Sequence, residues 1–242
     1  MFHQATPIPL AERMRPKQLE DLVGQRHLLA VQQPLFKAVK NKQAHSMLLW
    51  GPPGVGKTSL ARLLADAFQM PFMSLSAIES GVKEIRACIA KAQQAGAILL
   101  FIDEIHRFNK SQQDSLLAAV DKGLITLIGA TTENPSFEVI SPLLSRCQLY
   151  VLKHLTEEEL ISAVKTADDS GQPLLILGGG SNILVSDSGF AGLVIKVETS
   201  GNSFEIDACS GGTLTVSAGA DWDEFVGFTI EKGLANLESL SG

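Results

Sequence analysis

Two short stretches of the chain combine residue types and spacing that could do chemistry. Residues 51–58 read Gly-Pro-Pro-Gly-Val-Gly-Lys-Thr and stand between an apolar run (47–50) and a segment of helical spacing (59–65). Strand, glycine-rich turn and helix are the context in which this spacing makes a phosphate site. Glycines let successive backbone N–H groups point at an anion, and the helix adds the positive end of its dipole. The stretch therefore predicts a site for nucleotide phosphates.

Individual residues of this stretch have different expected parts. We expect Lys57 to reach the β- and γ-phosphates and the Thr58 hydroxyl to ligate Mg²⁺. The rest of the loop is expected to cradle the phosphates with its backbone: Gly51, Pro52, Pro53, Gly54, Val55 and Gly56. The alternative is a glycine-rich connection with a chance lysine. The complete eight-residue match, with suitable flanking elements, disfavours that alternative.

The second stretch is an apolar run that ends in two carboxylates. Residues 97–102 are continuously apolar, which is typical of a central parallel strand buried on both faces. Asp103 and Glu104 follow, at the strand end where open α/β sheets bind ligands. We expect Asp103 to hold Mg²⁺, and Glu104 to polarise the attacking water as a general base. A strand that ends in a solvated acidic turn is the alternative.

The elements that must position these groups alternate along the chain. Pro16 is expected to open a short helical turn, and Pro34 to break a helix or begin one. After the expected strand at 124–130, Thr132 offers a short polar side chain to a γ-phosphate or a water molecule. The other expected helices are 25–40, 57–68, 79–94 and 110–122, and the other strands are 71–75 and 148–152. This alternation predicts an α/β fold with a doubly wound parallel sheet.

Several runs in this part resemble one family. GPPGVGKT, LLFIDEIHRF, GATTENPSF and SPLLSRC, with the leading LAERMRPKQLEDLVGQRHLL, resemble the clamp-loader-like AAA+ ATPases. More narrowly they resemble the replication-associated recombination protein A (RarA) family, over about residues 9–152. The resemblance implies ATP and Mg²⁺ as ligands and a Mg²⁺-dependent ATPase. It also implies a homo-oligomer that acts on DNA, at stalled forks and single-strand–duplex junctions.

The resemblance assigns further roles position by position. It implies a Walker A loop at 51–58, a Walker B pair at Asp103 and Glu104, and sensor 1 at Thr132. Arg146 matches the arginine finger that acts on the neighbouring subunit; from its residue type alone, a surface or helix-capping arginine is the alternative. The adenine pocket is expected at Val23, Gly24 and Gln25.

The chain changes character after about residue 155. Residues 1–155 carry 17 Lys and Arg against 12 Asp and Glu, whereas residues 156–242 carry 3 against 14. One helix is expected from a capping box at Thr156, and a second over 222–232. Strands are expected at 174–177, 182–185, 192–197, 203–208 and 213–218. The family resembled by the first part would instead continue into a helical lid with a sensor 2 arginine, but no arginine follows Arg146.

This second part resembles another family. PLLILGGGSNILVSDSGFAGLVIKV and LTVSAGADWDEFVGFTIEKGLANLESLSG look like the FAD-binding domain of MurB, UDP-N-acetylenolpyruvoylglucosamine reductase. The resemblance implies a truncated α+β piece without that enzyme's catalytic residues. A glycine-rich loop there has amides that could cradle a pyrophosphate, although plain turns often have such glycines. Its residues are Gly178, Gly179, Gly180, Ser181 and Asn182.

We interpret the chain as two domains, 1–155 and 156–242, and as a chimera of two truncated genes joined near 155–165. Three functions stay open: an ATPase whose turnover is impaired by the missing lid, a fragment of a flavin oxidoreductase that would need FAD, and a fragment without activity. Three cysteines (Cys88, Cys147 and Cys209) lack metal or disulfide spacing. The sequence also has no signal peptide pattern and no apolar run long enough to span a membrane. These features favour a cytoplasmic location.

Overall fold

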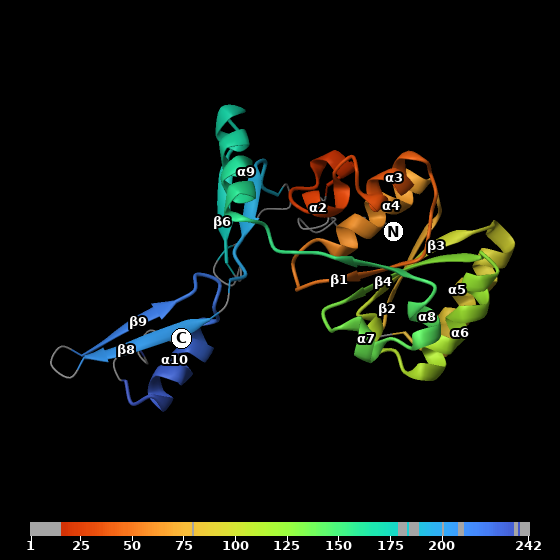
Figure 1. Ribbon diagram of the computed structural model, residues 1–242. Helices are drawn as coiled ribbons and strands as arrows, with labels where there is room; N and C mark the ends of the chain where they lie inside the picture. Colours follow the sequence, from red (N-terminus) through yellow and green to blue (C-terminus); the bar gives the residue numbers. More distant parts are fainter. Residues whose placement is uncertain are drawn as a thin grey trace, which may run out of the picture. The chain divides into compact units, whose positions relative to one another are not determined.

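The structure is a computed structural model and describes residues 16–78, 80–178, 183, 189–199, 201–207, 211–234 and 237. The described part of the chain forms two compact units (Figure 1). The first unit ends at Leu160, and the second begins at Ile161. Helix α9 (Glu157–Asp169) contains this boundary.

A five-stranded sheet forms the centre of the first unit. Every neighbouring pair of strands is parallel, and their order is β2-β3-β4-β1-β5. The strands are β1 (Met47–Trp50), β2 (Phe72–Ser76), β3 (Ile98–Asp103), β4 (Ile125–Thr131) and β5 (Gln148–Val151). The predicted parallel α/β sheet is thus confirmed. The carboxyl ends of the central strands β1, β3 and β4 meet at one edge, which is where an open sheet binds ligands.

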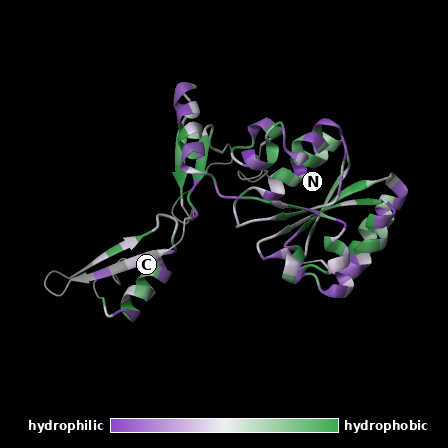
Figure 2. Ribbon diagram, viewed as in Figure 1, coloured by the Kyte–Doolittle hydropathy of each residue, from purple (hydrophilic) through white to green (hydrophobic). Residues whose placement is uncertain are grey.

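Helices cover both faces of this sheet. Figure 1 shows α3 and α4 on one face, and α5 and α6 on the other. The helices are η1 (Leu19–Asp21), α2 (Arg26–Leu29), α3 (Pro34–Lys40), α4 (Lys57–Phe68), α5 (Val82–Ala95), η2 (Ile105–Arg107), α6 (Lys110–Asp121), α7 (Pro135–Glu138) and α8 (Ser141–Leu144). Buried apolar residues of α4, α5 and α6 pack with residues of the strands, and Figure 2 shows hydrophobic and hydrophilic residues together on the helices.

Two buried clusters hold the helices to the sheet. Leu48, Leu100 and Leu127 belong to the cluster that includes residues of α5 and α6. Their strand neighbours, such as Leu49 and Phe101, belong to the cluster that includes residues of α4. Successive residues of a strand point to opposite faces, so a continuous apolar run supplies both clusters. This double coverage fixes the strand ends from which the candidate site is built.

Some boundaries differ from the sequence predictions. The expected helix over 25–40 is two short helices, because Pro34 lacks an N–H and occupies the first turn of α3. The first helical turn begins at Leu19 and not at Pro16. Helix α5 begins at Val82, after an extended Gly81 whose N–H donates to Glu84 Oε2 over 2.7 Å. Glu79, the expected start of that helix, lies outside the described residues.

The second unit contains two small sheets. Strands β6 (Leu174–Leu177) and β7 (Leu193–Lys196) pair in parallel, and β8 (Asn202–Asp207) and β9 (Gly211–Val216) form an antiparallel pair. Helix α10 (Trp222–Glu231) follows β9. The predicted strands near 174, 193, 203 and 213 are confirmed with small shifts. The strand expected at 182–185 falls almost wholly outside the described residues.

Candidate functional site

The glycine-rich loop lies between β1 and α4, as the sequence predicts. Lys57 is the first residue of α4 and is 8% exposed. Its ammonium group donates to the carbonyl of Gly51 over 2.7 Å and to the carbonyl of Pro52 over 2.8 Å. Burial lowers the pKa of Lys57 from its usual value, whereas the nearby charges of Glu104 and Asp103 act in the opposite direction. The loop thus contains a buried cation bound directly to neutral acceptors, an arrangement that fits an incoming anion.

The loop backbone depends on glycine at two positions. Gly54 and Gly56 have φ angles of 78° and 89°, in the region that side chains disfavour. Gly56 precedes α4 and, having no side chain, leaves the first amides of that helix uncapped, so these amides are available to a ligand. Thr58 is the second residue of α4 and is half-buried. The cradle therefore has the backbone conformation that a phosphate site requires.

The two carboxylates follow one another at the end of β3. Asp103 is the last residue of the strand and pairs in register with Ser76 of β2. Glu104 has a φ of 52°, an unusual value for a residue with a side chain, and its carbonyl accepts the N–H of Arg107 over 2.8 Å. This turn changes the chain direction from β3 into η2. The side chain of Glu104 is 29% exposed, so water can reach its carboxylate.

The end of β4 lies beside Glu104. Thr132 directly follows β4, and its hydroxyl lies 3.5 Å from Glu104 Oε2. The same Oε2 atom lies 3.1 Å from Nδ1 of His106, whose side chain is 14% exposed. The structure therefore brings together Lys57, Asp103, Glu104 and Thr132, all of which the sequence analysis selected. It adds His106, which the sequence analysis did not select as a site residue.

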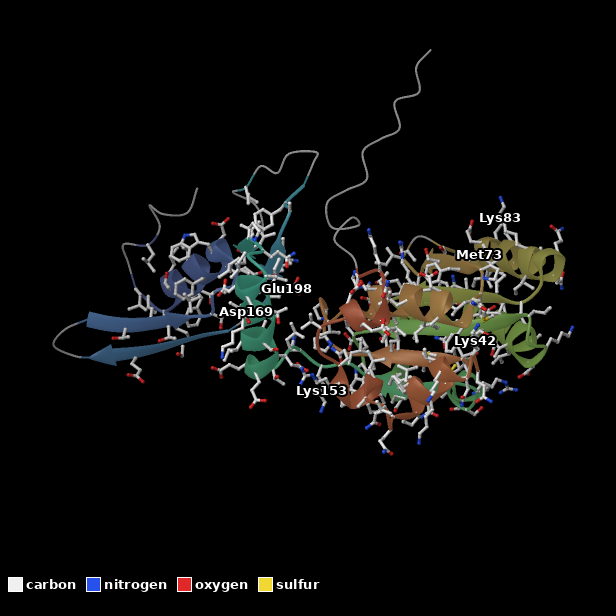
Figure 3. All side chains as sticks on the ribbon, turned by 90° about the horizontal axis from the view of Figure 1, so that it is seen from above. Lys42, Met73, Lys83, Lys153, Asp169 and Glu198 are labelled. Atoms are coloured by element: carbon white, nitrogen blue, oxygen red, sulfur yellow. The ribbon has the colours of Figure 1, made fainter. Side chains whose placement is uncertain are left out.

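Residues 23–25 lie against the segment that follows β5. The side chain of Gln25 is buried; its amide donates to the carbonyl of Lys153 over 2.6 Å and accepts the N–H of Lys153 over 3.1 Å. Figure 3 labels Lys153, which lies between β5 and α9. A side chain at Gly24 would collide with Leu155. Val23 is 46% exposed. These contacts hold residues 23–25 against the segment that follows β5, and their expected role in adenine binding stays a prediction.

Arg146 follows helix α8 and bonds within its own chain. Its guanidinium donates to Asp121 Oδ1 over 2.5 Å and to Oδ2 over 3.0 Å, and also to the carbonyl of Pro142 over 2.6 Å. The hydrogen bonds from Arg146 hold the pKa of the Asp121 carboxyl below its usual value. Arg146 is exposed at the surface of the first unit. Its described contacts are those of a surface arginine, and a role toward a neighbouring subunit stays a prediction.

The predicted pyrophosphate loop of the second unit is described at one residue. Gly178 follows β6, and a side chain there would meet no atom of the described residues within 4 Å. Gly179, Gly180, Ser181 and Asn182 lie outside the described residues.

Gln113 is a buried polar residue that the sequence analysis missed. Gln113 of α6 is 1% exposed, and its amide nitrogen donates to the carbonyls of Phe108 and Glu138 over 2.9 and 3.1 Å. Its amide oxygen accepts the N–H of Ile140 over 2.9 Å. The side chain thus connects α6 with the segment after β4. Its position three residues before Leu116, on the buried face of the helix, was the available signal.

The fold and this arrangement define a class of protein. Residues 47–155 match the family of ATPases associated with various cellular activities (AAA). The first unit also resembles the RuvB Holliday junction branch migration motor of Thermotoga maritima, with a TM-score of 0.52 and 32% identity; the similarity covers 67% of this chain and 56% of that chain. The first unit therefore has the AAA+ fold, and the resemblance inferred from its motifs is confirmed.

Comparison with individual proteins gives a narrower resemblance than the AAA family. The chain is 54% identical over 162 residues to Replication-associated recombination protein A of Coxiella burnetii. It is 49% identical over 185 residues to the protein of the same name from Escherichia coli. These similarities cover 66% and 72% of this chain but only 37% and 41% of the relatives. The chain thus spans about two fifths of the length of these proteins.

The second part matches a different family. Residues 149–241 match the FAD binding domain family, in agreement with the resemblance to the flavin domain of MurB. This match and the AAA match share residues 149–155, which include the end of β5. The change of family therefore falls close to the boundary between the two units.

Two observations concern other kinds of site. Among the described residues, no helix is both long and apolar enough to cross a membrane. The same residues contain no group of three or more His, Cys, Asp or Glu side chains that could hold a metal ion. A Mg²⁺ site made of Thr58, Asp103 and phosphate oxygens does not need such a group, because Mg²⁺ usually takes one or two protein ligands beside phosphates and water.

Proposed function

We propose that the first unit binds ATP with Mg²⁺ and hydrolyses it. The observation that carries this proposal is the buried ammonium of Lys57, bound to two loop carbonyls and close to Asp103 and Glu104. An isolated buried cation is costly, and an anion beside it lowers that cost. The loop amides, the start of α4 and the lysine would then all face the phosphates of one ligand.

The residues of the site have separate tasks in the proposed reaction. Lys57 would bind the β- and γ-phosphates, and Thr58 and Asp103 would hold Mg²⁺. Bound Mg²⁺ would supply charge neutralisation on the phosphate oxygens. Glu104 would accept the proton of the attacking water, while Thr132 would orient that water or the γ-phosphate. Residues 23–25 would contact the adenine.

Nucleotide titration tests the binding step. A fluorescent ATP analogue with Mg²⁺ should bind the full chain saturably, and Lys57→Ala should abolish binding at the same concentrations. Lys40→Ala is the matched control, because Lys40 is exposed in the last turn of α3, outside the proposed site. The absence of saturable binding by the unsubstituted chain would contradict the proposal.

Phosphate release tests the hydrolysis step. Glu104→Gln should retain binding and lose turnover by about 10²- to 10⁴-fold, the usual contribution of a general base. We expect turnover of the unsubstituted chain to be weak, since no arginine follows Arg146 and the described residues after α9 form strands and one helix. A helical lid with an arginine would otherwise exclude water and stabilise charge.

We further propose a role on DNA in replication-associated recombination, as a homo-oligomer of the clamp-loader-like kind. The names of the relatives and of the RuvB structure support this role for the matched part of the chain. Arg146 would have to leave Asp121 and reach the site of a neighbouring subunit. Turnover that rises more steeply than protein concentration and is lost in Arg146→Ala would support this arrangement. Turnover strictly proportional to concentration, and unchanged in Arg146→Ala, would contradict it.

The second part suggests a second candidate function, FAD binding. The match of residues 149–241 to a FAD binding domain family favours it. Absorbance in the flavin region after purification, or after incubation with FAD and gel filtration, would support it. A colourless protein after both treatments would leave the nucleotide site of the first unit as the proposed function. A chimeric origin, with domains 1–155 and 156–242, predicts a reading frame in the gene that continues without interruption across residues 150–175.

A further inference from the structure

His106 occupies a rigidly held turn directly after the two carboxylates. Its neighbour Ile105 is completely buried and belongs to the same cluster as Leu48. A Cβ atom added to Gly129 of β4 would lie 2.9 Å from Ile105 Cδ1 and 2.7 Å from Leu48 Cδ2. The glycine therefore lets η2 pack directly on β4. This packing places the imidazole between the end of β3 and the end of β4.

Two oxygen atoms face the same ring nitrogen. Nδ1 of His106 lies 3.1 Å from Oε2 of Glu104 and 3.0 Å from Oγ1 of Thr131. The Thr131 side chain is completely buried, whereas the Glu104 carboxylate is 29% exposed. The imidazole thus connects a group that water can reach with a group fixed inside the sheet.

Hydrogen-bond accounting assigns the proton on this nitrogen. The Thr131 hydroxyl donates to the carbonyl of Glu133 over 3.2 Å and accepts the N–H of Glu133 over 3.0 Å. A hydroxyl has one hydrogen, so while it donates to Glu133 the Thr131 oxygen can only accept from His106. An ionised Glu104 carboxylate also only accepts. Both partners therefore require that Nδ1 of His106 carries a hydrogen.

We propose that His106 is a positioning residue for Glu104: its Nδ1–H holds the carboxylate in place and is itself anchored to β4 through Thr131. This inference rests on the hydrolysis proposed above. A general base must lie within hydrogen-bond reach of the water from which it takes a proton. Among the described residues, the other hydrogen-bond partner of the Glu104 carboxylate is Thr132, at a long 3.5 Å, so the shorter contact with His106 fixes its orientation.

Three substitutions separate positioning from folding. His106→Asn keeps a donor near the place of Nδ1, because the amide nitrogen of asparagine overlies that atom. His106→Gln moves the donor to about the place of Nε2, on the opposite side of the imidazole from Glu104 and Thr131. His106→Leu removes the donor. We expect His106→Leu and His106→Gln to lower kcat about 10- to 100-fold, the range that a small misplacement of a catalytic group costs. His106→Asn should recover most of the loss, and KM should change less than twofold in all three.

Equal kcat values for His106→Leu and the unsubstituted chain would overturn the inference, as would an Asn variant no better than the Leu variant. The thermal midpoint of each variant identifies any loss caused by unfolding. Nitrogen NMR of the imidazole gives a readout that does not depend on activity. A hydrogen on Nδ1 that shifts in Glu104→Gln supports the inference, and a bare Nδ1 overturns it. If the unsubstituted chain binds no ATP, the proposed function fails while the NMR result still decides the contact.

Discussion

The two units differ in how completely their sheets are covered. In the first unit, five parallel strands have a buried cluster on each face. In the second unit, two separate pairs of strands are described, and only five described residues after Leu160 are buried: Ala167, Gly192, Phe225, Val226 and Thr229. Ile176 of β6 is 66% exposed. The candidate site depends on strand ends that a covered sheet holds in place. Exposed apolar strands such as those of the second unit instead favour association with other chains.

The largest expected effect concerns the response to nucleotide. At a free MgATP concentration of 100 times the Kd, the first unit should be stabilised by about 2.7 kcal/mol, because the ligand binds only its folded form. Peptides from residues 47–151 should gain protection in hydrogen-exchange mass spectrometry, whereas peptides from residues 174–231 should not. Equal protection of both sets would mean that the units fold as one, and the comparison would fail.

The next effect concerns packing in the covered sheet. Gly129→Val should destabilise the first unit by about 1–3 kcal/mol, because the new side chain would collide with Leu48 and Ile105. Urea unfolding reports this change through Trp50, provided that Trp222, the second of the two tryptophans, is replaced by Phe.

A contrasting glycine in the second unit serves as the control for that substitution. Gly227 lies inside α10, and within the described parts of the chain a Cβ atom there would meet nothing within 4 Å. Gly227→Ala should therefore stabilise its unit by about 0.5–1 kcal/mol, because alanine is the better helix former. Trp222 is the reporter here, in the Trp50→Phe background. Changes of opposite sign in the free energy of unfolding for Gly129→Val and Gly227→Ala would sharpen the comparison. Changes of the same sign would contradict it.

The last comparison uses one helix cap in each unit, with an effect of similar size. The Asn109 side chain accepts the N–H of Gln112 over 3.0 Å at the start of α6. The Asp221 side chain accepts the N–H groups of Asp223 and Glu224, each over 3.0 Å, at the start of α10. Alanine at either position should cost about 1 kcal/mol.

Each cap substitution should act on its own unit alone. Unfolding of the two single-tryptophan chains measures this separately for Asn109→Ala and Asp221→Ala. A cap substitution that moved both transitions equally would show coupling between the units.

The sequence predicted the parts of the site that are contiguous in the chain. The loop at 51–58 and the pair Asp103 and Glu104 need only local spacing, and their flanking elements follow from apolar patterns. Gly129 belongs to no local motif. The need for glycine at this position is evident only in the folded chain, where β4 lies beside β3 and η2 packs on β4. The sequence predicted the strands but not their order, because pairing depends on contacts between distant segments.

Other contacts of the site were beyond sequence reasoning for the same reason. Gln25 bonds to Lys153, 128 residues away, and Arg146 bonds to Asp121, 25 residues away. The contact of His106 with Thr131 requires the register of β3 and β4. Residue types gave each of these side chains several possible partners, and only the folded chain selects one.

The two carbonyls that hold Lys57 have a consequence for nucleotide entry. They keep the glycine-rich turn in one conformation before any phosphate binds. The conformational entropy of the loop is therefore lost when the chain folds, and nucleotide binding does not carry that cost. An arriving triphosphate would replace two neutral acceptors with charged ones around an ammonium group that is already in place. We expect such a preorganised loop to bind nucleotide rapidly and to change little in mobility on binding.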